Sequence, residues 1–141
     1  MNAVSTVCER SFFALVEPPG PRQRQAVAGG NRWYEATVAF DGPLAGRFCI
    51  VLPPDLAHEL FAAFLGCDEA QPAGESALHD VLGELANMAC GRWLTLIDGA
   101  ACFTLAHPSV RSVDEANMAG ATLLAVNEQP LIVSLEVAGR P

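Results

Sequence analysis

Two pairs of β-rich runs, each joined by a short turn, constrain the fold of this chain more than any other feature. In residues 33–40, WYEATVAF, apolar and polar side chains alternate as a half-buried strand requires. The turn DGPLAG follows, and RFCIVL at 47–52 supplies a strand that pairs back on the first. The runs ATLLAV at 121–126 and LIVSLEV at 131–137 flank the turn NEQP and predict a second hairpin. We therefore expect an antiparallel sheet.

Three segments carry apolar residues at helical spacing. Residues 3–16 repeat apolar side chains at mixed three- and four-residue steps. Pro53 and Pro54 are placed to open a second helix, and Gly66 is placed to end it. The third and longest helix is expected over residues 76–95. Each helix has an apolar side to bury, so we expect all three to pack on the sheet.

The remaining segments complete an α+β chain. Residues 17–31 are rich in proline, glycine and polar residues, which predicts an irregular connector. A strand is expected at 101–106, after the turn residues DG. This element order indicates an α+β fold with a largely antiparallel sheet and packed helices. The length of 141 residues suits a single domain, with the N-terminal helix and connector in 1–32 and the sheet and third helix in 33–141.

Composition narrows the choice of partners and compartment. The net charge is −8 and all eight basic residues are arginines, a balance that repels nucleic acid and anionic lipid. No apolar run approaches the ~20 residues that a membrane-spanning helix needs, and the N-terminus does not resemble a signal peptide. The five cysteines form no CxxC pair, so neither a disulfide framework nor a zinc site is expected. We expect a cytoplasmic protein without nucleic-acid or membrane partners.

The third helix has two different faces. At about 100° per residue, its apolar side gathers Leu78, Val81, Leu82, Leu85, Ala89 and Trp93. Within about 60° of one another on the opposite side are Asp80, Glu84, Asn87 and Gly91. This polar stripe is flanked by Gly83 and Met88. Each glycine costs a helix interior about 1 kcal/mol relative to alanine, so their place beside the outward face suggests a docking surface.

The order of these residues resembles the signature helix of the CheX-type chemotaxis phosphatases, relatives of CheC and of the phosphatase domain of FliY. In DVLGELANMACGRW, residues 80–93, the pattern is acidic–x–x–Gly–Glu–x–x–Asn–apolar–x–x–Gly. The matching residues are Asp80, Gly83, Glu84, Asn87, Met88 and Gly91. The resemblance extends from about Val38, through GRFCIVLPPDLAHELFAAFLG, to the closing hairpin.

The resemblance implies a phosphatase that acts on CheY, a response regulator with an aspartyl phosphate and a bound Mg²⁺. It implies that Asn87 holds the attacking water in line with the phosphorus, and that Glu84 pairs with the receiver's lysine. It also assigns partner contacts to Asp80, Gly83, Met88 and Gly91, with the glycines letting the helix lie close to the receiver. No cofactor of its own is expected, because the Mg²⁺ belongs to the receiver.

One departure from the family pattern and two alternatives remain. CheC-type members carry a second motif in their first long helix, but here Glu9 is followed by Phe12 where asparagine would be required. We therefore expect one active site per chain. The first alternative is a non-enzymatic module that binds a receiver or a flagellar-switch partner. The second is a homodimer in which another copy buries this face. The presence of both Glu84 and Asn87 favours the enzyme, because a pure binder does not need the amide.

Other motifs are incomplete. The HE pair at 58–59 is followed by alanine at position 62, so no HExxH zinc motif exists. GESAL at 74–78 lacks the closing glycine of a nucleophile elbow, and we interpret Ser76 as a helix N-cap. The residues interpreted as surface or helix-end residues, not as ligands, are His58, His79 and His107.

Overall fold

The computed structural model describes residues 2–29, 32–66, 74–100 and 102–137. Its helices are α1 Asn2–Ser11, α2 Pro21–Ala28, α3 Pro54–Leu65 and α4 Glu75–Ile97. Its strands are β1 Val16–Glu17, β2 Trp33–Asp41, β3 Gly46–Leu52, β4 Thr104–Leu105, β5 Ser109–Val113, β6 Ala121–Val126 and β7 Gln129–Val137. The expected α+β class is confirmed.

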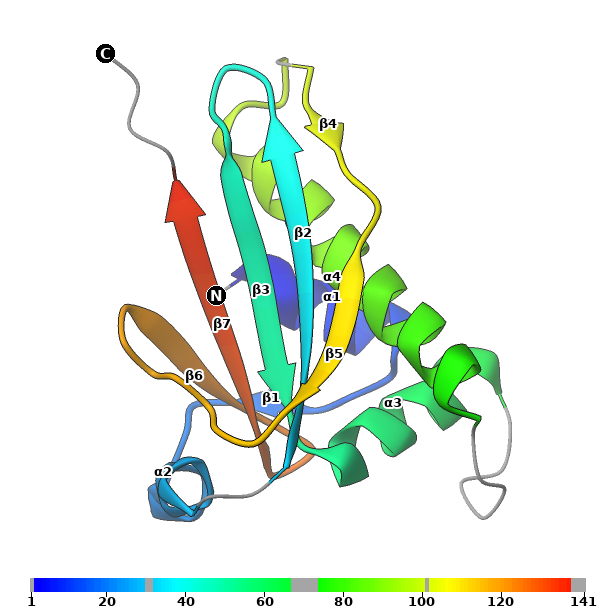
Figure 1. The fold of residues 1–141 in the computed structure, drawn as a ribbon, viewed down its shortest axis with the longest axis vertical. Helices are drawn as coiled ribbons and strands as arrows, with labels where there is room; N and C mark the ends of the chain where they lie inside the picture. The colour runs from blue at the N-terminus through cyan, green and yellow to red at the C-terminus, as the bar shows by residue number, and fades with distance from the viewer. Residues whose placement is uncertain (1, 30–31, 67–73, 101, 138–141) are drawn as a thin grey trace.

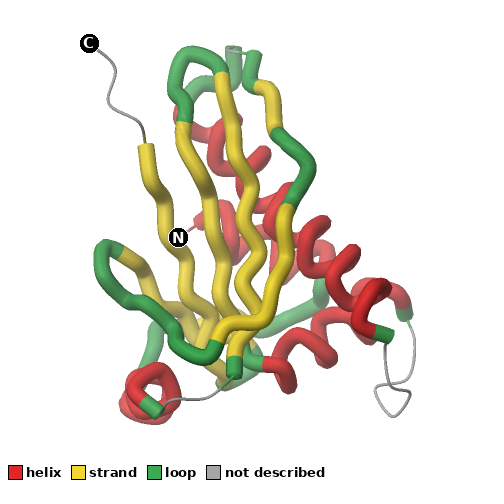
Figure 2. Tube along the Cα trace, viewed as in Figure 1, coloured by secondary structure: helices red, strands yellow, loops and turns green. Residues whose placement is uncertain are grey.

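The described strands form one antiparallel sheet in the order β1-β6-β7-β3-β2-β4, and β5 also pairs with β2. Figures 1 and 2 show α1, α3 and α4 together on one face of this sheet, while α2 lies apart at its lower end. Both predicted hairpins are present: β2 pairs with β3, and β6 pairs with β7. The antiparallel sheet predicted from them is confirmed.

The turn between β6 and β7 shows how local chemistry sets the register. Val126 pairs with Gln129, so only Asn127 and Glu128 lie in the turn. Their φ angles are +49° and +67°. Two consecutive positive φ angles give the type I′ turn, whose twist matches the twist of the strands it joins. The Asn127 Oδ1 also accepts the N–H of Leu15 at 2.9 Å, which ties the turn to the chain entering β1.

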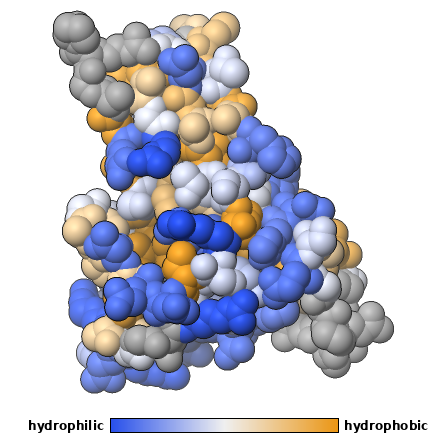
Figure 3. Space-filling model, in the orientation of Figure 1, coloured by the Kyte–Doolittle hydropathy of each residue, from blue (hydrophilic) through white to orange (hydrophobic). Residues whose placement is uncertain are grey.

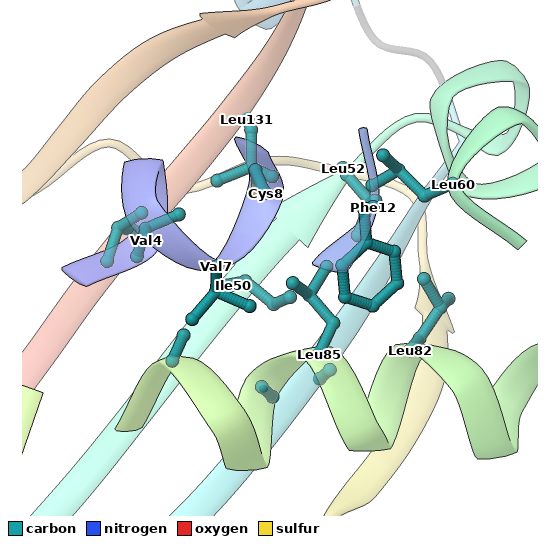
Figure 4. Close-up of a cluster of buried hydrophobic side chains, with 14 of the residues drawn as sticks. Val4, Val7, Cys8, Phe12, Ile50, Leu52, Leu60, Leu82, Leu85 and Leu131 are labelled. Carbon is teal, nitrogen blue, oxygen red and sulfur yellow. The ribbon is translucent and has the colours of Figure 1, made fainter. Parts of the chain in front are cut away.

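The main core lies between the sheet and the three helices on its face. Figure 4 shows Leu82 and Leu85 rising from α4 toward Phe12, the residue after α1. The predicted buried positions of α4, which all have 0% exposure, are Leu78, Leu82, Leu85 and Ala89. Phe12 is also fully buried and stacks on Phe64 of α3, with ring centroids 4.8 Å apart. The predicted core face of α4 is confirmed.

The helix ends agree with prediction only in part. Gly66, with φ +67°, ends α3 as predicted. α1 stops at Ser11 and not at residue 16, because the chain turns at Phe13, whose φ is +54°. The prediction that Ser76 caps α4 is wrong. Extended Gly74 precedes a helix that already starts at Glu75, so Ser76 lies inside it.

The prediction that residues 17–31 form an irregular connector is wrong, because this segment contains α2 and the end of β1. α2 is a short, mostly polar helix without an apolar stripe, so no local periodicity indicates it. Its buried Gln23 holds it in place: Oε1 accepts the Gly20 N–H at 2.7 Å, and Nε2 donates to the Glu128 carbonyl at 2.6 Å. These contacts link α2 to the β6–β7 turn, far away in the sequence.

The strand predicted at 101–106 is also different from the one observed. Position 101 lies outside the described residues, and only Thr104–Leu105 forms a strand, β4. The sequence analysis missed β5, Ser109–Val113, which is short and mixed in polarity. It pairs with β2 from Thr37 to Trp33. This pairing places the segment before β5 beside α4.

The sheet face that lacks α1, α3 and α4 mixes polar and apolar side chains, as the blue, white and orange areas in Figure 3 show. Arg47 pairs with Glu136 at 2.8 Å, and Arg111 pairs with Glu35 at 2.8 Å. These exposed ion pairs bridge neighbouring strands and contribute little to stability.

Candidate functional site

The outward side of α4 carries the residues that the sequence motif singled out. Asp80 and Glu84 are exposed, and Asn87, Met88 and Gly91 are partly exposed. Because α4 is continuous, the three-residue step from Glu84 to Asn87 puts both side chains on the same side of the helix. The predicted placement of these two residues, facing away from the buried leucines, is confirmed.

Glu84 and Asn87 line one hollow of about 350 Å³, which we name the Asn87 hollow. α4 forms one wall, and the segment that leads from β4 into β5 forms the other. The lining residues are His79, Asp80, Gly83, Glu84, Asn87, His107, Pro108 and Val110. Two segments about twenty positions apart in the sequence therefore build this site together.

Two residues that line this hollow, Asn87 and His79, have a buried side-chain atom without a hydrogen-bond partner among the described residues, and the amide of Asn87 is the one in the motif. Its Oδ1 atom is buried and has no hydrogen-bond partner among the described residues, although the side chain as a whole is partly exposed. A buried acceptor without a partner costs about 1–3 kcal/mol, and folded proteins keep few such atoms. Oδ1 therefore keeps an unused capacity to accept a hydrogen bond, beside a hollow that the Asn87 side chain lines.

Negative charge borders the hollow on the side of α4. Among the residues that the structure describes, neither Asp80 nor Glu84 takes part in an ion pair. An exposed carboxylate with no internal cation is available to a cation from another molecule. The outward side of α4 thus offers an amide acceptor and two carboxylates.

A cluster at the start of α4 borders the hollow through His79. Tyr34 donates a hydrogen bond to Glu75 Oε1 at 2.7 Å, and this bond holds the pKa of Glu75 below its usual value. Burial, together with the same bond, raises the pKa of Tyr34. His79 Nε2 lies 3.2 Å from Glu75 Oε2, without the geometry of a hydrogen bond.

The two glycines of α4 have different surroundings. Gly83 is buried, and a Cβ atom there would lie 3.1 Å from Cγ of Pro108. Gly83 lines the Asn87 hollow as a flanking residue of the polar stripe, but the neighbour that its missing side chain admits in this structure is Pro108 of the same chain. Its predicted contact with a partner stays a prediction. A Cβ atom at Gly91 would meet no atom within 4 Å.

Alanine at the two glycines should therefore affect stability differently. Gly91→Ala should raise the free energy of unfolding by about 0.5–1 kcal/mol, because the helix gains propensity and the methyl group meets no neighbour. Gly83→Ala should raise the free energy of unfolding by a smaller amount or lower it, because Pro108 must move to admit the methyl group. Urea denaturation of both variants measures the difference. Equal gains would contradict the importance of the contact between Gly83 and Pro108.

Comparison with known families gives this site its context. Residues 34–133 match the family described as "Chemotaxis phosphatase CheX". This chain belongs to the CheX family. No curated protein matches its sequence.

Solved structures of CheX proteins share the fold. Chemotaxis protein CheX from Vibrio vulnificus superposes with a TM-score of 0.71 at 18% identity, covering 97% of this chain and 92% of that one. CheX from Desulfovibrio desulfuricans gives 0.68 at 19% identity, covering 97% and 95%. The CheX–CheY–BeF₃–Mg²⁺ complex from Borrelia burgdorferi gives 0.63 at 13% identity, covering 98% and 94%. At these identities the likeness shows a common fold.

The first helix of this CheX-family chain offers no second site. Phe12 stands where a second motif would require asparagine, and it is fully buried against Phe64. Glu9 is exposed but has no amide partner at the motif spacing. That the chain has one active site stays a prediction.

The sequence analysis missed the second wall of the Asn87 hollow. His107, Pro108 and Val110 come from the segment around a strand that the analysis did not predict. His79, near the start of α4, and exposed His107 are surface or helix-end residues as predicted, and both also line the hollow. In the sequence, Gly83 is the feature most directly related to this wall. Because Gly83 has no side chain, Pro108 can lie close to α4.

Two further observations concern the described part of the chain. No group of three or more His, Cys, Asp or Glu side chains in it is arranged to hold a metal ion. None of its helices combines the length and the apolar character that crossing a membrane requires.

Proposed function

We propose that this CheX-family chain stimulates the dephosphorylation of a phosphorylated receiver domain of the CheY kind. The observation that carries the proposal is the buried, unpartnered Oδ1 of Asn87 in a hollow that it shares with exposed Glu84. Membership of a chemotaxis phosphatase family supports it, as does the solved complex of a CheX protein with CheY. A CheY-like partner would place the chain in the cytoplasm.

The proposed reaction is hydrolysis of the receiver's aspartyl phosphate. A water oxygen bonds to phosphorus while the bond from phosphorus to the aspartate oxygen breaks, and the phosphate takes up the proton of the water. Such a transfer depends on positioning and charge stabilisation more than on covalent chemistry by the protein. Asn87 Oδ1 would accept a hydrogen bond from the water and orient it, a role for which an amide that does not titrate is suited.

Glu84 has a different role in the proposal. Its exposed carboxylate would pair with the lysine of the receiver's site and fix the register of docking. Asp80 and Met88, on the same outward side, would contact the receiver around this pair. The receiver would supply the Mg²⁺ that neutralises charge on the transferring phosphoryl group.

A receiver and its metal should both be required for activity. With a phosphorylated receiver and Mg²⁺, the chain should speed the loss of phosphate, and chelation of Mg²⁺ should abolish this effect. A small ester such as p-nitrophenyl phosphate should be hydrolysed poorly, because one amide and one carboxylate do not neutralise a transferring phosphoryl group. Phosphate release under these conditions is the measurement. Efficient hydrolysis of the small ester without metal or receiver would overturn the mechanism.

A further inference from the structure

A second hollow continues the outward side of α4 beyond Asn87. It has a volume of about 350 Å³, and we name it the Gly91 hollow. Gly91 and Thr95 of α4 form one side, and Phe103 and Leu105 form the other. The end of α4 and β4 lie at the same end of the sheet, which places this hollow there (Figure 1).

No contact among the described residues explains why position 91 is a glycine. Glycine weakens the middle of a helix, and at Gly83 the contact with Pro108 accounts for it. No such contact exists at Gly91, where an added Cβ atom would meet nothing within 4 Å. The helix is not interrupted there either, since α4 runs on to Ile97 and Thr95 Oγ1 donates to the Gly91 carbonyl at 3.0 Å. A break of local preference without an internal gain is expected at functional sites.

The position of Gly91 connects the two hollows. It follows Asn87 by one helical turn, a rise of about 6 Å, on the same outward side. A protein docked over Asn87 therefore reaches Gly91 as well. The walls of the Gly91 hollow include the partly buried rings and methyl groups of Phe103 and Leu105, while Asp98 adds a carboxylate beside them.

We propose that the Gly91 hollow receives an apolar side chain of the same phosphorylated receiver, at a place where that receiver also presents basic residues. This inference rests on the proposed function and adds a determinant of receiver choice. The apolar walls suit an aliphatic or aromatic side chain. Along this side of α4 lie the carboxylates of Asp80, Glu84 and Asp98. They would attract basic residues of the receiver that surround the docked apolar side chain. Gly91 keeps the Gly91 hollow accessible, because a larger side chain at this position would fill part of its volume.

The test compares the wild-type chain with Gly91→Leu, Gly91→Ala and Ala28→Leu. The probe is the receiver domain from the same genome that the chain dephosphorylates fastest, activated with beryllium fluoride and Mg²⁺ for binding and phosphorylated for kinetics. Ala28 is exposed at the end of α2, which lies at the opposite end of the sheet from the Gly91 hollow (Figure 1), so Ala28→Leu is the matched control for added bulk.

Gly91→Leu should raise Kd and KM at least about tenfold and leave kcat nearly unchanged, since the hollow adds binding and not chemistry. Gly91→Ala should give a smaller rise in Kd together with a higher Tm, and Ala28→Leu should bind like the wild type. Wild-type binding by Gly91→Leu, with Asn87→Ala still inactive, would overturn this inference and leave the proposed function standing. An equal loss of affinity in Ala28→Leu would also overturn it, because added bulk far from the Gly91 hollow would then weaken binding just as much. Failure of the wild-type chain to act on any receiver would remove both proposals.

Discussion

Asn87→Ala should lower the stimulated rate of receiver dephosphorylation by about 100-fold, the scale of effect expected when a reacting group loses its positioning. Affinity for the receiver should stay within about threefold of the wild type, because the amide acts on the attacking water and contributes little to docking. Rates with phosphorylated receiver and Kd values with the beryllium fluoride form separate the two effects.

Two comparison variants make this result specific. Asn117→Ala is the matched control, because it removes an exposed asparagine between β5 and β6, away from α4. Its rate should equal that of the wild type. Glu84→Ala should instead weaken binding by about 1.5–3 kcal/mol, through loss of a charge-assisted contact, and the loss should shrink at high salt. Equal losses of affinity in Asn87→Ala and Glu84→Ala would contradict the division of roles.

Phe12→Ala should destabilise the chain by about 3–5 kcal/mol, the range for removing a large aromatic ring from a core. Phe12 has 0% exposure and stacks on Phe64 at 4.8 Å, so the surrounding helices are left with a cavity. The neighbouring Phe13 is 76% exposed and provides the control. Phe13→Ala should change stability by less than about 0.5 kcal/mol, as most surface substitutions do.

Urea denaturation of the two phenylalanine variants measures this contrast. The same burial predicts that Phe12→Asn, which restores the missing motif residue after Glu9, weakens the fold and creates no second active site. A stable Phe12→Asn variant with increased phosphatase activity would contradict the interpretation that α1 serves only the core.

Long elements with a clear period were predictable from the sequence. The apolar spacing of α4 fixed which side is buried, and that in turn placed Glu84 and Asn87 together on the outward side. The hairpin at Asn127–Glu128 was predictable because its turn residues separate two β-rich runs. In each case the signal lies within about twenty neighbouring residues.

The elements that were missed depend on contacts between distant parts of the chain. α2 is held by Gln23 against the carbonyl of Glu128, and β5 exists because it pairs with β2. Neither contact leaves a local pattern. For the same reason the wall that contains Pro108 was not predicted. The missing side chain of Gly83 was explained by the close approach of a partner protein, whereas the residue close to it in the structure is Pro108 of the same chain.

The central claim is that this CheX-family chain removes phosphate from a receiver through Asn87. The most direct measurement follows the loss of radiolabelled phosphate from phosphorylated receivers of its own genome, with Mg²⁺, in the presence of the wild-type chain or Asn87→Ala. We predict that the wild type accelerates the loss from at least one receiver, while Asn87→Ala lowers this stimulated rate by about 100-fold, toward the receiver's spontaneous rate. If the wild type binds a receiver and its phosphate still decays at the spontaneous rate, the claim is contradicted and the chain is a binding module.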